Sequence, residues 1–523
     1  CFSVLSTIIN KFVSIMQSLR TASAFVQAAC PKTAVAEASL RLTEALGTSI
    51  SLVIFFGSGP FWPQTNLATM FEDSLGSDTI VVGACGGSTS SFGIISGSYE
   101  VQDGSPAISA MAISLGAERG VGTRLGVFTS GANNPDPFTS SNLRWWSGSS
   151  GNRTLSPEPT WAEMASRPAS AAPDVLLLSA AASEEEGFSH TASLLRRLGL
   201  LLPYSVTVGG VIPGGGSSGA SAAIFGPGRT HSQLASETTT LGLIIDGDPS
   251  TRLRMDALVC PGPTSFGESH VVTDFKRHGE DVFIFALGGV PIRELIDSIL
   301  EQFQSVEGND GSLFVGIDVG TGNQQKSHSS SSDSSSTLLC RVSAADRGQL
   351  YPSGFLSLEH VDPRWLTTGS KIRFYALSKT GAVSNLERHI SDYTSMRNAG
   401  KRTAVQSERK SVVQEDNAAV VFSCLGRGVG LHDGEEDVES SVMAKRLSQC
   451  HGSSCDAEEE EEGNGYSSTS TPGGSDANFD SAGFFGGGEV GPISTALSGG
   501  KNCPEGGMSP ILHSFATTIA IFR

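Results

Sequence analysis

The strongest candidates for chemistry are two ionisable residues, Arg427 and Glu489, each in a glycine-rich turn. Arg427 lies between Gly426 and Gly428 directly after an apolar run, and Glu489 follows three glycines. Glycine lets a backbone approach a ligand closely, and the planar guanidinium of arginine matches a carboxylate. If adjacent strands bring the two residues together, Arg427 is predicted to hold a carboxylate and Glu489 an amine. The alternative is an internal Arg427–Glu489 ion pair.

Two other glycine-rich segments match catalytic or cofactor motifs only in part. Residues 215–219 place Ser217 in a G-x-S-x-G pattern, but glycines stand where a nucleophile elbow needs a strand. Residues 486–491 match the dinucleotide pattern G-x-G-x-x-G, which must open a helix. Pro492 follows directly, and no helical pattern begins there. We therefore predict a flexible loop at the first segment and no dinucleotide cofactor at the second.

The spacing of the cysteines indicates neither a catalytic nor a metal site. Cys85 ends an apolar run, but no histidine or aspartate partner is evident, so a buried thiol is predicted. Cys450, His451 and Cys455 do not have the spacing of a zinc site. We therefore predict no enzyme activity, no metal and no cofactor. The nine cysteines form no disulfide framework, which favours reduced thiols in a cytoplasmic or nuclear protein.

Apolar runs that alternate with helical patterns predict an α/β fold that positions these residues. Strand–helix–strand units are predicted at 51–56, 67–75 and 79–83, at 281–287, 292–303 and 313–317, and at 418–424, 438–447 and 482–485. The runs 355–360 and 371–378 have no helix between them, so antiparallel additions and mixed sheets flanked by helices are expected. Arg427 would then lie at the carboxyl edge of a sheet, where open α/β folds bind ligands.

The charge balance argues against some partners. The 523 residues include 35 basic and 53 acidic residues, for a net charge of −18. Nucleic acid and anionic membrane surfaces would repel such a chain, so neither is predicted as a partner. No stretch of the sequence has the length and apolarity of a membrane-spanning helix.

Several segments are predicted to lie outside the packed core. Residues 131–172, rich in Ser, Pro and Trp, and the glycine-rich residues 211–219 are predicted to be insertions. The serine-rich residues 323–336 and the acidic residues 448–480 are predicted to be disordered insertions. Residues 1–32 contain no acid and are predicted to be an amino-terminal extension. Its alternatives are a transit segment, which would direct the protein to an organelle, a truncated start, or an amphipathic helix.

Several strands and glycine-rich loops of this sequence resemble segments of the FIST family of sensory and signal-transduction domains. Residues 419–428 (AVVFSCLGRG) are similar to the strand and GRG loop of that family, and residues 483–492 (GFFGGGEVGP) to its GF…GEIGP element. Residues 512–515 (LHSF) look like the start of its closing strand. Residues 52–56 (LVIFF) and 81–87 (VVGACGG) are similar to the partner FIST N-terminal domain.

The resemblance implies a FIST N-like α/β domain over 33–275 and a FIST C-like α/β domain over 281–523. It also implies a non-enzymatic sensory or signal-transduction module for small, amino-acid-like ligands. With the Arg427 loop, it predicts a cleft for a carboxylate-bearing ligand. The residues expected to line that cleft are Cys424, Arg427, Gly428, Gly488, Glu489 and His513.

An alternative function follows from the same resemblance. The combination of domains is similar to the FIST-bearing region of eukaryotic F-box proteins, which recruit substrates to cullin-based ubiquitin ligases. The protein would then be a substrate-recruiting subunit, with ubiquitin-ligase components as partners. Residues 1–45 lack the Leu-Pro-rich helical pattern of an F-box, which a truncated start would explain.

Overall fold

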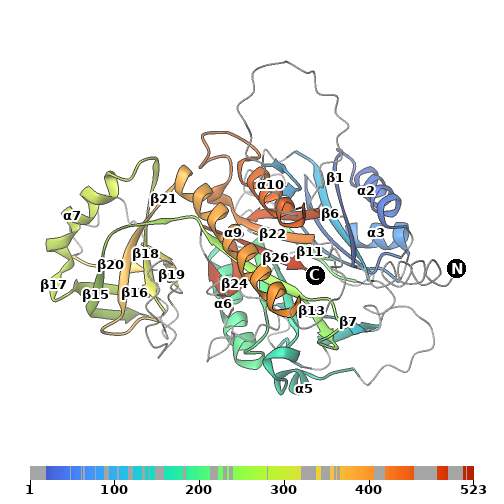
Figure 1. Ribbon diagram of the computed structural model, residues 1–523, viewed down its shortest axis with the longest axis horizontal. Coiled ribbons are helices and arrows are strands. Elements are labelled where there is room, and N and C mark those ends of the chain that lie inside the picture. The colour runs from blue at the N-terminus through green and yellow to red at the C-terminus, as the bar shows by residue number, and fades with distance from the viewer. Residues whose placement is uncertain are drawn as a thin grey trace, which may run out of the picture.

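The computed structural model shows a mixed α/β fold, which confirms the predicted class. The structure describes residues 19–47, 49–59, 62, 65–76, 78–86, 93–102, 105–115, 122–131, 136–139, 142–147, 158–180, 184–212, 222–227, 232–234, 239–278, 281–319, 337–342, 354–358, 361, 365–405, 418–452, 480–492, 510–513 and 515–523. These residues form four β-sheets and seven α-helices, arranged as Figure 1 shows.

Sheet 1 contains the predicted amino-terminal strand–helix–strand unit. In spatial order its strands are β1 (Arg20–Gln27), β6 (Ala107–Ser114), β2 (Leu52–Ser58), β3 (Ile80–Gly86), β11 (Ala222–Phe225) and β12 (Ser232–Leu234). Helices α2 (Pro31–Leu46) and α3 (Leu67–Leu75) cover one face, where Leu42 and Phe71 pack with Phe55 of β2. The parallel pairing of β2 with β3 around α3 agrees with the predicted unit.

Sheet 2 combines strands from both halves of the chain. In spatial order they are β25 (Pro510–His513), β24 (Gly488–Pro492), β10 (Thr207–Ile212), β9 (Asp174–Ala180), β13 (Thr239–Gly247), β7 (Thr123–Gly131) and β8 (Leu143–Ser147). Helices α5 (Trp161–Ala165) and α6 (Glu184–Leu201) pack on one face, where Trp161 and Leu198 join Phe128 of β7 in one cluster. The antiparallel pairing of β24 with β10 joins the two halves.

Sheet 3 contains the predicted carboxyl-terminal unit. In spatial order its strands are β14 (Met255–Pro261), β26 (Ala516–Phe522), β22 (Ala418–Cys424), β23 (Asp480–Gly486), β4 (Gly93–Ser96) and β5 (Tyr99–Val101). Helices α9 (Lys379–Val405) and α10 (Val438–Gly452) cover one face, where Leu386 and Leu447 pack with Val421. β22 and β23 are parallel, as predicted, whereas the β4–β5 hairpin comes from the amino-terminal half and adds to β23.

The other faces of sheets 1, 2 and 3 enclose the largest hydrophobic core. Phe56 of sheet 1 meets Phe422 and Phe484 of sheet 3 there, with ring centroids 5.1 Å apart for Phe56–Phe484 and 5.3 Å apart for Phe422–Phe484. A Cβ on Gly210 of β10 would lie 2.7 Å from both of the sheet 3 rings, so glycine lets sheet 2 approach. Burial on both faces explains why β2 and β22 are continuous apolar runs.

Sheet 4 forms a separate lobe, drawn at the left of Figure 1 with α7 beside it. Its strands are β17 (Val290–Pro291), β16 (Asp281–Leu287), β15 (Thr264–His278), β21 (Lys371–Ser378), β18 (Asn309–Asp318) and β19 (Thr337–Arg341), with β20 (Leu356–Leu358) beside β16. Helix α7 (Ile292–Gln304) packs through Ile296 and Ile299 against Ile284. The ring of Phe314 lies 5.0 Å from that of Phe515, which connects the lobe to the start of β26.

One predicted boundary differs at the amino terminus. The predicted extension 1–32 includes β1, which pairs with β6 along its whole length. The buried residues of β1 alternate but include the small Ala22 and Ala24, so the apolar signal of this strand is weak. Residues 1–18 lie outside the described residues, and so do Ser217 and the predicted insertion 323–336.

Predicted boundaries also differ in the second half. Helix α10 continues to Gly452 and β23 begins at Asp480, so both enter the predicted insertion 448–480, of which residues 453–479 lie outside the described residues. Sheets 2 and 3 contain strands from both sides of the division at 275–281, and that division into domains stays a prediction. None of the helices in the described part of the chain is long and apolar enough to cross a membrane.

Asp480 connects sheets 1 and 3, so we expect Asp480→Ala to lower the free energy of unfolding by roughly 1–3 kcal/mol. Its carboxylate accepts hydrogen bonds from Thr21 Oγ1 (2.8 Å), Ser23 N (3.0 Å) and Ser23 Oγ (3.1 Å) on β1. Urea unfolding of the parent and the variant measures the loss. The control is Asp318→Ala at the exposed end of β18, which should change stability by less than about 0.5 kcal/mol. Equal losses in both variants would contradict this anchoring role.

Candidate functional site

Arg427 lies in a short 3-10 turn after β22 and is completely buried. Its Nε donates to Glu439 Oε1 at 2.8 Å, and its Nη2 lies 2.7 Å from the same oxygen. The guanidinium also donates to the backbone oxygens of Cys260 (2.8 Å) and Ala382 (3.4 Å). Arg427 therefore forms an internal ion pair with Glu439, and the alternative prediction of an Arg427–Glu489 pair named the wrong partner.

Glu439 completes this ion pair from the first turn of α10. Its Oε2 accepts hydrogen bonds from Ser423 Oγ (3.3 Å) and Thr517 Oγ1 (3.1 Å). Burial opposes ionisation of Glu439, but the charge of Arg427 outweighs it and holds the pKa below the usual value. His432 Nε2 is 3.8 Å from Glu439 Oε1, which is too far for a hydrogen bond. Nearly every polar atom of the ion pair is thus engaged within the protein.

Glu489 also lies in this interior, where burial favours its protonated form. Its Oε2 accepts a hydrogen bond from Ala516 N at 3.2 Å, and its Oε1 has no hydrogen-bond partner among the described residues. Burial raises the pKa of Glu489 well above its usual value, although the Arg427 charge opposes the shift. A neutral carboxyl does not bind an amine as a carboxylate would, so the structure does not favour the predicted amine contact at Glu489.

Two further predicted residues, His513 and Cys424, lie beside Glu489 and are buried. His513 lies opposite Glu489 in the β24–β25 pairing, and its Nε2 is 2.9 Å from the backbone oxygen of Pro492. Burial lowers the pKa of His513 to about 4, so the imidazole is neutral and donates this hydrogen bond. Burial also raises the pKa of the Cys424 thiol, and the nearby Glu489 adds to that shift. Both groups are therefore uncharged near neutral pH.

The two predicted glycines serve internal packing. A Cβ on Gly428 would lie 1.9 Å from Gln102 Oε1, and this oxygen accepts a hydrogen bond from Val429 N at 3.0 Å. A Cβ on Gly488 would lie 2.5 Å from the ring of Phe188 on α6. The lack of a Cβ at both positions thus makes room for a neighbouring side chain. The structure brings Cys424, Arg427, Glu489 and His513 together as a buried polar cluster, whereas Gly428 packs against Gln102 and Gly488 against Phe188.

The other motif residues have no catalytic arrangement in the described structure. Cys85 is completely buried in β3, and burial raises the pKa of its thiol well above the usual value. Gly486 ends β23 and Gly488 begins β24, so the dinucleotide-like pattern lies across two strands and not at the start of a helix. Among the described residues, no group of three or more His, Cys, Asp or Glu side chains is placed to hold a metal ion.

A small pocket lies elsewhere, between the edge of sheet 2 and the end of β11. Its volume is about 70 Å³. The residues that line it are Val127, Thr129, Asn142, Arg144, Trp146, Gly226, Pro227 and Leu241. Arg144 is the one formally charged residue among these eight. The sequence predictions did not include this pocket.

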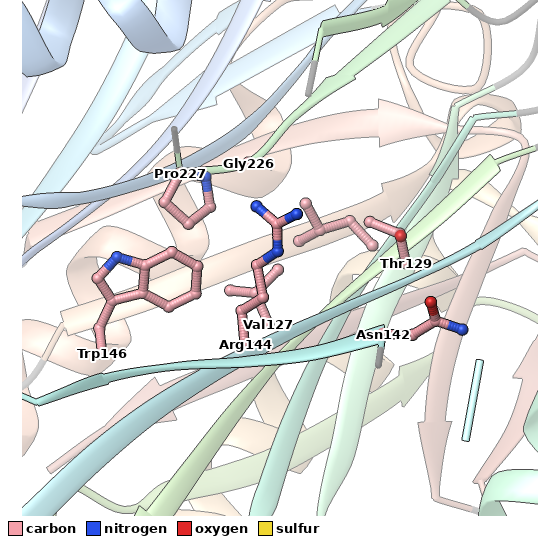
Figure 2. A pocket seen from close by; sticks show the side chains of 8 residues that line it. Val127, Thr129, Asn142, Arg144, Trp146, Gly226 and Pro227 are labelled. Carbon is pink, nitrogen blue, oxygen red and sulfur yellow. The ribbon is translucent and has the colours of Figure 1, made fainter. Parts of the chain in front are cut away.

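The pairing of β7 with β8 explains how Arg144 reaches the pocket. Arg144 lies opposite Val127, and Trp146 lies opposite Leu125, so Arg144 and Trp146 share one face of the edge strand. Figure 2 shows the Arg144 guanidinium reaching between Pro227 and Thr129, with the indole of Trp146 alongside. Among the described residues, no hydrogen bond or ion pair engages this exposed guanidinium.

The polar wall of the pocket is held in place by its neighbours. Asn142 Nδ2 donates to the backbone oxygen of Asp136 (2.9 Å) and to Thr139 Oγ1 (2.8 Å), which fixes the orientation of the Asn142 amide. Trp146 packs against the main core, so its ring forms a firm apolar wall. An arginine with free donors beside an apolar wall suits a small anion with an apolar part, such as a short carboxylate.

The comparisons with known proteins do not identify the chain. No protein-family model matches it, and no curated protein matches it significantly. The resemblance to the FIST family, and the ubiquitin-ligase role that it implies, therefore stay predictions.

The buried ion pair gives a first test of the interior cluster. We expect Arg427→Ala and Glu439→Gln each to lower the free energy of unfolding by roughly 3–5 kcal/mol, because each leaves the other charge buried and unpaired. Denaturant unfolding measures these losses. Lys445→Ala, on the exposed side of α10, is the control and should cost less than about 0.5 kcal/mol. Losses below about 1 kcal/mol in both cluster variants would show that the pair does not stabilise the fold.

The neutral state of Glu489 predicts a pH dependence. Because the folded-state pKa of Glu489 is raised, its contribution to stability is full below the unfolded-state pKa and is lost as pH rises through the folded-state value. The stability of the parent minus that of Glu489→Gln should therefore fall as pH rises from about 4.5, by up to ~1.4 kcal/mol per pH unit. Urea unfolding of both proteins between pH 5 and pH 8 measures this difference. A difference that rises with pH would mean that Glu489 is ionised.

Proposed function

We propose that this protein is a non-enzymatic sensory module that binds a small carboxylate-bearing ligand in the Arg144 pocket. The observation that carries the proposal is the Arg144 guanidinium, which lines the pocket and has no partner among the described residues. Arg427, the sequence-based candidate for this role, is committed to Glu439 and to two backbone oxygens. The predicted class of ligand is retained, and its proposed binding residue changes.

The size of the pocket limits the part of the ligand that enters it. The pocket has a volume of about 70 Å³. Each molecule in liquid water occupies about 30 Å³, so the pocket is little larger than the volume of two water molecules. A carboxylate with one or two further carbons fills that space, with both oxygens on the guanidinium and the carbons against Trp146. An amino-acid-like ligand would place its carboxylate end here. The rest of such a ligand would extend beyond the lining residues.

The chemistry of the lining favours binding over catalysis. The eight lining residues include no carboxylate, imidazole, thiol or lysine, which are the usual groups for proton transfer or nucleophilic attack. Affinity is expected to be modest, since even the best tiny ligands gain about 1.5 kcal/mol per non-hydrogen atom. A four-atom ligand then has a Kd no lower than about 40 μM. A sensor of an abundant small metabolite can operate in this range.

We expect acetate, propionate and alanine to bind with Kd values of roughly 0.1–10 mM, and Arg144→Gln to weaken this binding at least tenfold. Trp146 lies beside the guanidinium, so ligand titrations followed by tryptophan fluorescence report occupancy of this pocket. Ligand-observed NMR gives an independent affinity. Acetamide and propionamide, which have the same shape without the charge, should bind much more weakly.

Matched variants separate this pocket from general charge effects. Arg144→Lys keeps the charge but loses the two-pronged geometry, so an intermediate affinity is expected. Trp146→Phe should remove the fluorescence change and keep most of the binding seen by NMR. Arg293→Gln, which removes one positive charge from α7 in the sheet 4 lobe, should bind like the parent. Equal binding by the parent and Arg144→Gln, or no carboxylate binding up to 50 mM (about the weakest affinity that such a sensor could use), would refute the proposal.

A further inference from the structure

The β4–β5 hairpin carries a carboxyl group into the start of a helix from the other half of the chain. β4 pairs with β23 and β5 pairs with β4, so the hairpin forms the outer edge of sheet 3. Glu100 lies on β5 and is only 5% exposed. Its Oε1 accepts a hydrogen bond from Ser440 N, in the first turn of α10, at 2.8 Å. One side chain thus joins segments that are 340 residues apart.

The contacts around Glu100 form a connected junction. Its own backbone N–H donates to Asp437 Oδ1, just before α10. Gln102 Nε2 donates to Glu100 Oε2 at 3.3 Å. Gln102 Oε1 accepts from Val429 N at 3.0 Å, in the loop that follows Arg427. The hairpin therefore contacts α10 and the β22 loop through one continuous chain of hydrogen bonds.

The charges that surround Glu100 make its ionised form costly. The start of α10 contributes the carboxylates of Asp437 and Glu439, which repel a second negative charge. From the β22 loop come Arg427 and His432, but Arg427 is paired with Glu439 and His432 lies 3.8 Å from that same carboxylate. The positive end of α10 and the Ser440 N–H favour a carboxylate in part. Burial works against it.

We propose that protonation of Glu100 locks the β4–β5 hairpin onto α10, so that acidification tightens this junction and neutral pH loosens it. The protonated carboxyl keeps an oxygen that accepts the Ser440 N–H hydrogen bond, and it removes a charge that faces two other carboxylates. An ionised Glu100 carries that charge in the interior. Opening of the hairpin exposes it to water and relieves the cost.

The raised pKa of Glu100 lies near neutral pH. Burial raises its pKa to about 7, the hydrogen bonds from Ser440 oppose this shift, and the charges of Glu439 and Asp437 add to it. In the opened hairpin the group returns to the ordinary pKa of about 4.3. The closed form therefore binds the proton more tightly than the open form. The junction is most stable below the open-state pKa, weakens as pH rises towards 7, and then stays constant.

Hydrogen exchange of the full chain tests this switch directly. After correction for intrinsic exchange rates, protection of the β4 and β5 amides and of Ser440 N–H should fall by up to about tenfold per pH unit between pH 5 and pH 7. It should level off above about pH 7.5. Glu100→Gln imitates the protonated form, so protection in this variant should stay high and vary less than about twofold over the same range.

Two controls address other carboxyl groups. Glu301→Gln, on the exposed side of α7, should keep the pH dependence of the parent. Glu489→Gln should keep it as well, although Glu489 also has a raised pKa.

A second measurement applies if Glu100→Gln folds poorly. The Glu100 carboxyl carbon, followed by NMR in the parent, should titrate near pH 7 together with the Ser440 amide. A Glu100 midpoint below pH 5, or equal pH dependence in Glu100→Gln and the parent, would overturn the proposal.

Discussion

The buried charges of Arg427 and Glu439 can exist in the interior only if they satisfy each other, and this requirement fixes the elements around them. Removing two charges from water costs several kcal/mol per ion, which close contact and further hydrogen bonds must offset. Arg427 therefore also binds backbone oxygens of β14 and α9, and Glu439 binds hydroxyls of β22 and β26. A shift of any of these elements would remove a hydrogen bond that helps to offset the cost of the buried charges.

Burial and the contacts of Arg427 together explain why the pKa of Glu439 is lowered while those of the nearby acids Glu489 and Glu100 are raised. Arg427 is the positive charge closest to both Glu439 and Glu489, and its direct contacts go to Glu439. A second buried carboxylate would repel the first without a cation of its own. Burial is the main reason that the pKa values of Glu489 and Glu100 are raised, that of Glu100 to about 7, and the charge of Glu439 adds to both shifts. The direct contacts of Arg427 thus favour the ionised form of Glu439, whereas burial without such contacts favours the protonated forms of Glu489 and Glu100.

The sequence predicts those elements whose burial leaves a strong local signal. The strand 418–424 and the helix 67–75 match β22 and α3 to the residue, since a strand buried on both faces and an amphipathic helix have distinct patterns. The partner of Arg427 could not be predicted in this way, because it depends on which face of α10 meets sheet 3. β8 was missed because it is a five-residue edge strand within a segment rich in Ser, Pro and Trp. The apolar and aromatic residues Leu143, Trp145 and Trp146, which are common in strands, were the available signal.

Burial decides which arginine is suited to an external ligand. A ligand that replaced Glu439 at Arg427 would pair with the arginine and leave the buried carboxylate of Glu439 without a partner. That would cost several kcal/mol. Arg144 is exposed and has no partner among the described residues, so the proposed carboxylate would bind it without breaking an ion pair that the structure shows. The net charge of −18 repels anions at long range, but salt screens charges beyond about 8 Å at physiological ionic strength. Within that distance the lining of the pocket carries a single formal charge, and it is positive. The proposed binding of a carboxylate therefore depends on this local charge and not on the acidity of the whole chain.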